Sequence, residues 1–164
     1  MLAYYGNAQR TSEDPNADTT DYAQALKPPG SSFKPYTLAT ALENGYSDDT
    51  VRDGSSPQLF KDRTKPVTNS SNAQCPACTL KQSITKSLNT VFYGVAYDVG
   101  PAKVAVTARA ATGIPDTWPN DASVPETIRG KPSLTSPDNG QTGGAIGIGE
   151  YEVCLLYTSD AADE

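Results

Sequence analysis

The distribution of apolar and polar positions along the chain predicts helices separated by long polar loops. The opening stretch MLAYYG has alternating bulky residues and a terminal glycine, which is typical of the end of a strand. After a polar loop, residues 31–44 read as an apolar helix. Gly30 permits a tight entry to this helix, and Gly45 is suited to end it. Pro35 falls in the first turn, where its missing N–H costs little.

A second helical region covers residues 79–100 and is interrupted around the Ser-Leu-Asn sequence at 87–89. A third helix covers residues 100–113, where a proline near the start and a glycine after the end match the usual helix signals. The connections at 51–74 and 115–143 are rich in Gly, Pro, Ser and Asn, so we expect them to be irregular.

Size and charge limit the classes of partner. The chain has 164 residues, which suits one domain or part of one. Its net charge of −6 argues against a nucleic-acid partner, because no basic surface would neutralise a row of phosphates. No run of about 20 apolar residues predicts a membrane span. The stretch MLAYYGNAQR also lacks the basic start and apolar centre of a signal peptide.

Histidine is absent, which excludes Ser-His-Asp and Cys-His catalysis and most zinc sites. Cys75 and Cys78 form a C-x-x-C pair, but no second pair completes a zinc site. A thioredoxin-like site would need a strand-to-helix setting, whereas this pair follows the polar stretch VTNSSNAQ. We therefore favour a local disulfide between Cys75 and Cys78 in an exported loop; two inert thiols are the alternative.

Ser31 and Lys34 are the first candidate catalytic pair. They are three residues apart at a helix entrance, so their side chains share one face. The positive end of the helix dipole favours a developing oxyanion there. A partly desolvated lysine has a lowered pKa, and its neutral amine can activate a serine without histidine. Ser32 lies off the shared face and is rejected as the nucleophile. An ordinary Ser cap beside a surface lysine is the alternative interpretation.

Ser87 and Asn89 form the second candidate element, at the break between two helical stretches. A hydroxyl and a carboxamide two positions apart in a turn can point into one cleft. The hydroxyl can relay a proton and the amide can hold a substrate backbone. Taken alone, Asn89 could also simply cap the next helix.

Together and in this order, the two elements resemble the transpeptidase domain of penicillin-binding proteins. These proteins and class A β-lactamases carry S-x-x-K, then a Ser-Asp-Asn-type sequence, then K-T-G. The flanks PPGSSFKPYTLATALENG, CTLKQSITKSLNTVFYGVAYDVGPAKV and IGIGEYEV look like a bifunctional, class A member from high-GC Gram-positive bacteria. The resemblance spans residues 2–153.

The resemblance implies an α+β fold of the penicillin-binding protein and serine β-lactamase type. It implies a peptidoglycan D,D-transpeptidase that cross-links stem peptides and is acylated by β-lactam antibiotics. Ser31 would be the acylated nucleophile and Lys34 its general base, with the Ser31 N–H as half of an oxyanion hole. Ser87 would pass a proton toward the leaving D-alanine, and Asn89 would hold the donor peptide. No metal or organic cofactor is needed, and the parent protein would be anchored at the extracytoplasmic face of the membrane.

The third motif of the family is missing. The nearest string, QTGG at 141–144, has no lysine and precedes IGIGEYEV, so we read it as loop. We therefore expect residues 1–153 to be a partial transpeptidase domain, mainly its helical part with most sheet strands missing. The membrane anchor and glycosyltransferase domain of the family are not recognisable either. We expect such a fragment to be inactive alone.

The last residues depart from the family pattern. Residues 154–164 read CLLYTSDAADE, where the family would continue into a helix with Pro, Leu and Gln. This string matches a translation of a transposon-end adapter used in DNA sequencing libraries. We expect residues 154–164 to be a non-native tail, with a natural acidic tail as the alternative.

Three other classes of function compete with the transpeptidase. A serine β-lactamase shares the first motif, although SLNTVFYG and IGIGEYEV favour a penicillin-binding protein. A non-catalytic β-lactam-sensing or binding domain would keep the fold without the reaction. An inert truncation product would have no function of its own.

Overall fold

The computed structural model describes residues 26–122, 124, 126–136 and 139–154. Its elements, in chain order, are β1 Leu26–Lys27, η1 Gly30–Phe33, α1 Lys34–Glu43, β2 Val51–Arg52, η2 Ser70–Asn72, β3 Cys78–Thr79, α2 Leu80–Thr85, α3 Asn89–Val99, α4 Pro101–Thr112, η3 Gly144–Ile148 and β4 Val153–Cys154, where η denotes a 3-10 helix. The expected strand at MLAYYG and all of the expected tail 154–164 except Cys154 lie outside the described residues.

Local signals account for the helix boundaries. Thr79 and Gln82 form a reciprocal capping box at the start of α2. Pro101 occupies the first turn of α4, and Gly113 ends that helix in the left-handed conformation. The first helix begins later than expected, because a 3-10 turn precedes α1. Pro35 has no N–H to close an α-helical bond, whereas the Lys34 N–H bonds to the Ser31 carbonyl in the tighter 3-10 pattern.

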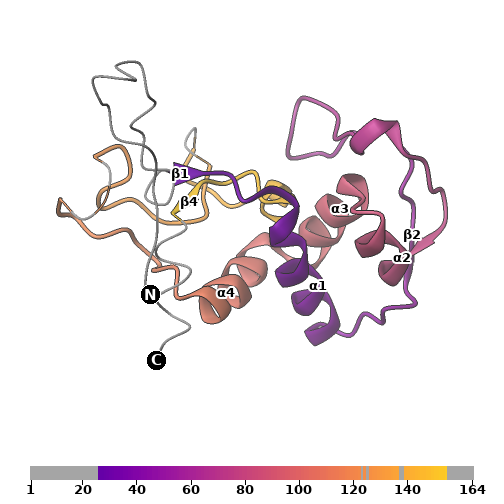
Figure 1. The fold of residues 1–164 in the computed structure, drawn as a ribbon, viewed down its shortest axis with the longest axis horizontal. Coiled ribbons are helices and arrows are strands. Elements are labelled where there is room, and N and C mark those ends of the chain that lie inside the picture. Colours follow the sequence, from indigo (N-terminus) through magenta and orange to yellow (C-terminus); the bar gives the residue numbers. More distant parts are fainter. Residues whose placement is uncertain (1–25, 123, 125, 137–138, 155–164) are drawn as a thin grey trace, which may run out of the picture.

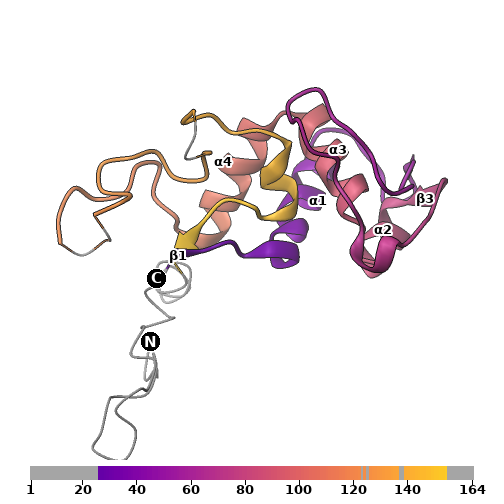
Figure 2. The same cartoon turned by 90° about the horizontal axis from the view of Figure 1, so that it is seen from above.

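The helices pack around α3, which contacts α1, α4 and η3 (Figures 1 and 2). The apolar face of α3 supplies much of the core, together with residues from α1, α4 and η3. Gly147 of η3 lies so close to α3 that a Cβ there would fall 2.6 Å from the Cβ of Ala96. Glycine therefore allows the short helix η3 to sit directly on α3.

The strands are short, and they pair segments that are distant in sequence. β1 and β4 are antiparallel, with Leu26 opposite Cys154, and lie beside each other at the edge of the helical body (Figure 1). β2 and β3 are antiparallel, with Arg52 opposite Cys78. The expectation of a mainly helical α+β chain with few sheet strands is confirmed for the described residues.

The long connections are irregular, as predicted, but they pack on the helices. Trp118, Val124 and Leu134, from the 115–143 stretch, are buried in the main core. Arg109 of α4 holds this stretch by donating to the Ser133 carbonyl at 2.7 Å. In the part of the chain that the structure describes, no helix is long and apolar enough to cross a membrane.

Candidate active site

The Ser-x-x-Lys sequence places an exposed serine above a buried lysine. Ser31 lies in η1 and is exposed, whereas the Lys34 side chain at the start of α1 is fully buried. Side chains three residues apart eclipse one another in a 3-10 turn. The Lys34 Nζ accordingly lies 2.9 Å from the Ser31 Oγ. The local fold therefore brings a solvent-accessible hydroxyl against a desolvated amine.

The turn between α2 and α3 supplies the other side of the site. Ser87 has a φ of +53°, a left-handed conformation that is uncommon for a residue with a Cβ. This conformation directs both the carbonyl and the hydroxyl of Ser87 toward Lys34. Such sparsely populated backbone conformations are concentrated at functional sites.

Lys34 is the centre of the cluster. Its Nζ lies 2.7 Å from the Ser87 carbonyl and 2.9 Å from the Ser87 Oγ. It also lies 2.7 Å from the Oδ1 of Asn89, the first residue of α3. The structure therefore brings together the four side chains singled out in the sequence, Ser31, Lys34, Ser87 and Asn89.

The environment of Lys34 makes its charged form less favourable than in water. The four contacts of the Lys34 Nζ are to uncharged oxygens, so among the described residues no carboxylate in contact offsets the loss of hydration of an ammonium. Burial lowers the pKa of Lys34 from 10.5 to about 8. Roughly a tenth of the molecules then carry the neutral amine at pH 7.

A neutral amine can satisfy three of the four contacts at one time, and the Ser87 Oγ is the fourth. The amine's lone pair can accept the Ser31 hydroxyl proton, while its two hydrogens can be donated to the Ser87 carbonyl and Asn89 Oδ1. Ser32, the neighbouring hydroxyl, instead donates to the Pro29 carbonyl at 2.8 Å. The arrangement can therefore activate Ser31 and leaves Ser32 pointing elsewhere.

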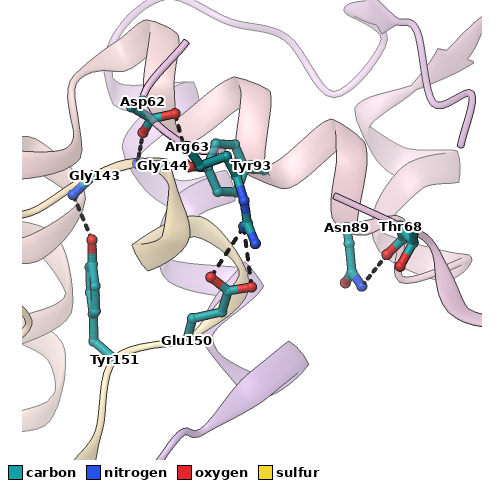
Figure 3. A network of polar contacts seen from close by, with 9 residues as sticks. All are labelled: Asp62, Arg63, Thr68, Asn89, Tyr93, Gly143, Gly144, Glu150 and Tyr151. Carbon is teal, nitrogen blue, oxygen red and sulfur yellow. Dashed lines mark hydrogen bonds and ion pairs between the residues drawn. The ribbon is translucent and has the colours of Figure 1, made fainter. Parts of the chain in front are cut away.

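Asn89 is held from the side opposite Lys34. Its Nδ2 donates to the Thr68 carbonyl at 2.8 Å (Figure 3). Thr68 belongs to the loop that also carries the Cys75–Cys78 disulfide. The amide is therefore oriented with its oxygen toward the lysine.

A second polar cluster, centred on Asp62, lies farther along α3 (Figure 3). Asp62 Oδ1 accepts from the Tyr93 hydroxyl at 2.9 Å, and Oδ2 accepts from the Gly144 N–H at 2.8 Å. Burial and the Asp62 carboxylate raise the pKa of Tyr93, so its hydroxyl remains a donor. Arg63 lies over the Tyr93 ring and pairs with Glu150 at 3.2 Å.

The Asp62 cluster joins the 58–67 loop to the segment around η3, and no sequence motif pointed to it. A cavity of about 560 Å³ opens beside it, with Lys65, Gln141 and Tyr151 in its lining. Tyr151 accepts from the Gly143 N–H at 2.7 Å. Arg63 and Glu150 are therefore an ion pair, whereas the exposed Asp62 carboxylate accepts from two neutral donors.

The segment held by the Asp62 cluster also contacts the turn that carries Ser31. Gly149 follows η3 with a φ of +67°, and its carbonyl accepts the Gly30 N–H at 3.0 Å. A Cβ at Gly149 would collide with the Gly30 backbone, so only glycine fits. Because Gly30 precedes Ser31, this contact fixes the entrance of the Ser-x-x-Lys turn.

Comparisons with known proteins agree with this geometry. The profile of the penicillin binding protein transpeptidase domain matches residues 2–153. The chain is 35% identical to penicillin-binding protein 1A of Mycobacterium tuberculosis over 98% of its own length and 18% of that protein. It is 30% identical to penicillin-binding protein 1A of Mycolicibacterium smegmatis, again covering 98% of the chain and 18% of the relative.

A solved structure of a penicillin-binding protein is also similar in fold. The penicillin-binding protein PonA1 of Mycobacterium tuberculosis, in complex with penicillin V, superposes with a TM-score of 0.67 at 29% identity. The match covers 86% of this chain and 35% of that one. With the profile matching nearly its whole length, the chain belongs to the penicillin-binding protein transpeptidase family.

Proposed function

We propose that the protein carrying this chain is a peptidoglycan D,D-transpeptidase that works through a Ser31 acyl-enzyme. The observation that carries the proposal is the contact of one buried, neutralisable lysine with Ser31, Ser87 and Asn89. A serine activated by a desolvated lysine is a nucleophile suited to acyl transfer without histidine. The curated relatives named penicillin-binding protein 1A support the assignment.

In the proposed reaction, the Ser31 Oγ attacks the carbonyl between the two terminal D-alanines of a stem peptide while Lys34 takes the hydroxyl proton. The Ser31 N–H stabilises the oxyanion. As the C–N bond breaks, Ser87 passes a proton to the departing D-alanine amine and takes the proton held by Lys34 in its place, which leaves an ester on Ser31 and a neutral Lys34. Asn89 holds the donor peptide. An amine of a neighbouring stem peptide then attacks the ester and loses a proton to Lys34, which returns that proton to the Ser31 Oγ as the ester bond breaks and the new amide forms.

A β-lactam would react at the same serine, because opening its ring also produces a Ser31 ester. The PonA1 complex with penicillin V supports this part of the proposal. We place the reaction at the extracytoplasmic face of the membrane, where peptidoglycan is assembled. No metal or organic cofactor takes part.

Labelling with a fluorescent penicillin tests the nucleophile. Ser31→Ala should abolish the adduct, whereas Ser32→Ala should label like the wild type, because the Ser32 hydroxyl bonds to the Pro29 carbonyl instead of Lys34. Undiminished labelling of Ser31→Ala would overturn the assignment. Rapid release of hydrolysed penicillin would instead indicate a serine β-lactamase, and a long-lived adduct without cross-linking would indicate a sensor or binding domain.

We also propose that residues 1–153 are part of a transpeptidase domain and that residues 154–164 are a non-native tail. The profile match at 2–153 supports the first part. The nucleotide sequence tests the second, since codons that differ from the adapter would rule it out.

A further inference from the structure

We propose that Asn69 is a positioning residue that acts as a remote cap for α3 and thereby holds Asn89 and Ser87 against Lys34. The inference rests on the proposed function for its catalytic consequence. Asn69 lies in the 51–79 loop, 21 residues before its partner Thr90. Its side chain makes no contact with the Lys34 cluster in the hydrogen bonds of the described residues, so its effect on the reaction is indirect.

The start of α3 lacks the usual cap. The first N–H groups of a helix have no partner within the helix, and the side chain of the N-cap residue usually accepts from one of them. The N-cap of α3 is Leu88, which has no acceptor and makes no such bond. Leu88 is fully buried, so this position is used for packing. An acceptor for α3 has to come from elsewhere in the chain.

Asn69 provides that acceptor. Its Oδ1 accepts from the Thr90 N–H at 3.0 Å and from the Thr90 hydroxyl at 3.2 Å. Thr90 is the second residue of α3, one of the positions that an N-cap side chain normally satisfies. Thr90 also directly follows Asn89, so this bond fixes the backbone next to the catalytic amide.

The other end of the Asn69 amide is anchored in the loop. Its Nδ2 donates to the Gly54 and Ala73 carbonyls, both at 2.9 Å. Asn69 is buried, with 5% of its surface exposed. Both N–H groups of its side-chain amide donate a hydrogen bond, and its oxygen accepts two. A smaller or differently polar side chain would leave buried groups on both sides without partners.

The same loop contacts α3 at two further points. Gly54 exchanges backbone hydrogen bonds with Cys75 of the disulfide, and a Cβ at Gly54 would fall 2.8 Å from Leu88. The Thr68 carbonyl accepts from Asn89. The loop therefore contacts three consecutive residues: it packs on Leu88, accepts from the Asn89 side chain, and caps the helix at Thr90. Asn69 is the residue that ties these contacts to the loop.

The test compares Asn69→Ala with Asn120→Ala, a matched change at an exposed asparagine. The readouts are the rate constant of fluorescent-penicillin labelling and the final amount of labelled protein. We expect Asn69→Ala to label about tenfold more slowly, the scale of a small misplacement of catalytic groups. The final amount should be retained, and Asn120→Ala should stay within about twofold of the wild type. A purely structural role would lower the amount and leave the rate constant unchanged, and that result would overturn the proposal.

If Asn69→Ala yields no labelled protein, the labelling rate constant of Thr90→Val tests the positioning role instead. It keeps the shape of the buried side chain and removes the hydroxyl donor to Asn69 Oδ1. We expect labelling about threefold slower than in the wild type, on the scale of one weak hydrogen bond. An unchanged rate constant would overturn the proposal.

Different results would contradict the proposed function and the proposed cap. A wild-type protein that does not label contradicts the function, and amide hydrogen exchange then tests the cap. Exchange at Thr90 should be faster in Asn69→Ala than in Asn120→Ala, because the amide loses its acceptor. Equal exchange in the two variants would overturn the cap.

Discussion

Two polar clusters packed on α3 differ in how far their central charged groups are exposed to solvent. The Lys34 cluster contains a buried cation whose four contacts are to neutral oxygens. The Asp62 cluster has an exposed carboxylate at its centre, pairs Arg63 with Glu150, and lies beside an open cavity. Burial lowers the pKa of Lys34 to about 8. Under the proposed function, the buried amine with a lowered pKa serves the chemistry, and the exposed Asp62 cluster holds the fold together.

The two clusters are nevertheless joined. The Asp62 cluster holds η3, and the residue after η3 bonds to Gly30 at the entrance of the Ser31 turn. Replacement of Lys34 should therefore change the rate of acylation without lowering stability, because its lowered pKa means that the charged lysine is unfavourable in the folded state. Substitutions in the Asp62 cluster should change stability first.

The largest expected effect is on the rate of acylation when Lys34 is replaced. Lys34→Met keeps most of the packing but removes the base, so penicillin labelling should slow by about 10² to 10⁴-fold, the range for general base catalysis. Lys81→Met, at an exposed lysine, serves as the control and should label normally. If the labelling rate constant of Lys34→Met is within tenfold of the wild type, Lys34 is not the general base and the two clusters do not differ in function.

Asp62→Ala should mainly lower stability. The Tyr93 hydroxyl and Gly144 N–H both lose their acceptor, at a cost of roughly 1.5 kcal/mol in the free energy of unfolding. Urea unfolding measures this change. Asp116→Ala is the control, since that carboxylate pairs with Arg109 but is 88% exposed, and its loss should cost less than about 0.5 kcal/mol. Slowing of labelling to the level of Lys34→Met would show that the Asp62 cluster is catalytic too.

The smallest expected effect is a pH dependence that belongs to Lys34. With a pKa of about 8, the neutral fraction and hence the labelling rate should rise about tenfold between pH 7 and pH 9. The free energy of unfolding should also rise with pH. The unfolded chain has the ordinary lysine pKa of 10.5 and binds more protons than the folded one between about pH 8 and 10.5, so stability rises with pH there.

Measurement of both profiles in Asp62→Ala sharpens the comparison. The profiles should keep their shape in that variant, because its lysine environment is intact. A flat profile in the wild type would contradict the assignment of Lys34 as the base.

Local features of the fold could be predicted, because they depend on neighbouring residues. The proline and glycine at the two ends of α4 marked that helix correctly. The Ser31–Lys34 spacing predicted the side-chain contact, although the turn is 3-10 where an α-helix was expected. Even Ser87 and Asn89 could be singled out, since they interrupt a helical pattern and resemble a family motif.

The supports of the site could not be predicted in this way. Asp62 and Asn69 lie in a stretch that read only as irregular connection, and each bonds to groups that are distant in sequence. Their partners include backbone N–H groups, which every residue except proline offers, so no residue pattern marks them. The conformation of η3 depended likewise on contact with α3.

The contact between the start of α1 and the segment around η3 also bears on the order of events during synthesis. The Thr37 hydroxyl donates to the Gly147 carbonyl across 110 residues of chain, and Gly149 closes on Gly30 in the same way. In a chain that is made and exported from its N-terminus, Ser31 emerges well before the segment that contacts Gly30. The α1, α2 and α3 helices can pack earlier, but Gly30 lacks this contact until residue 149 has also emerged. A nascent chain should therefore acquire its penicillin-reactive shape late and abruptly.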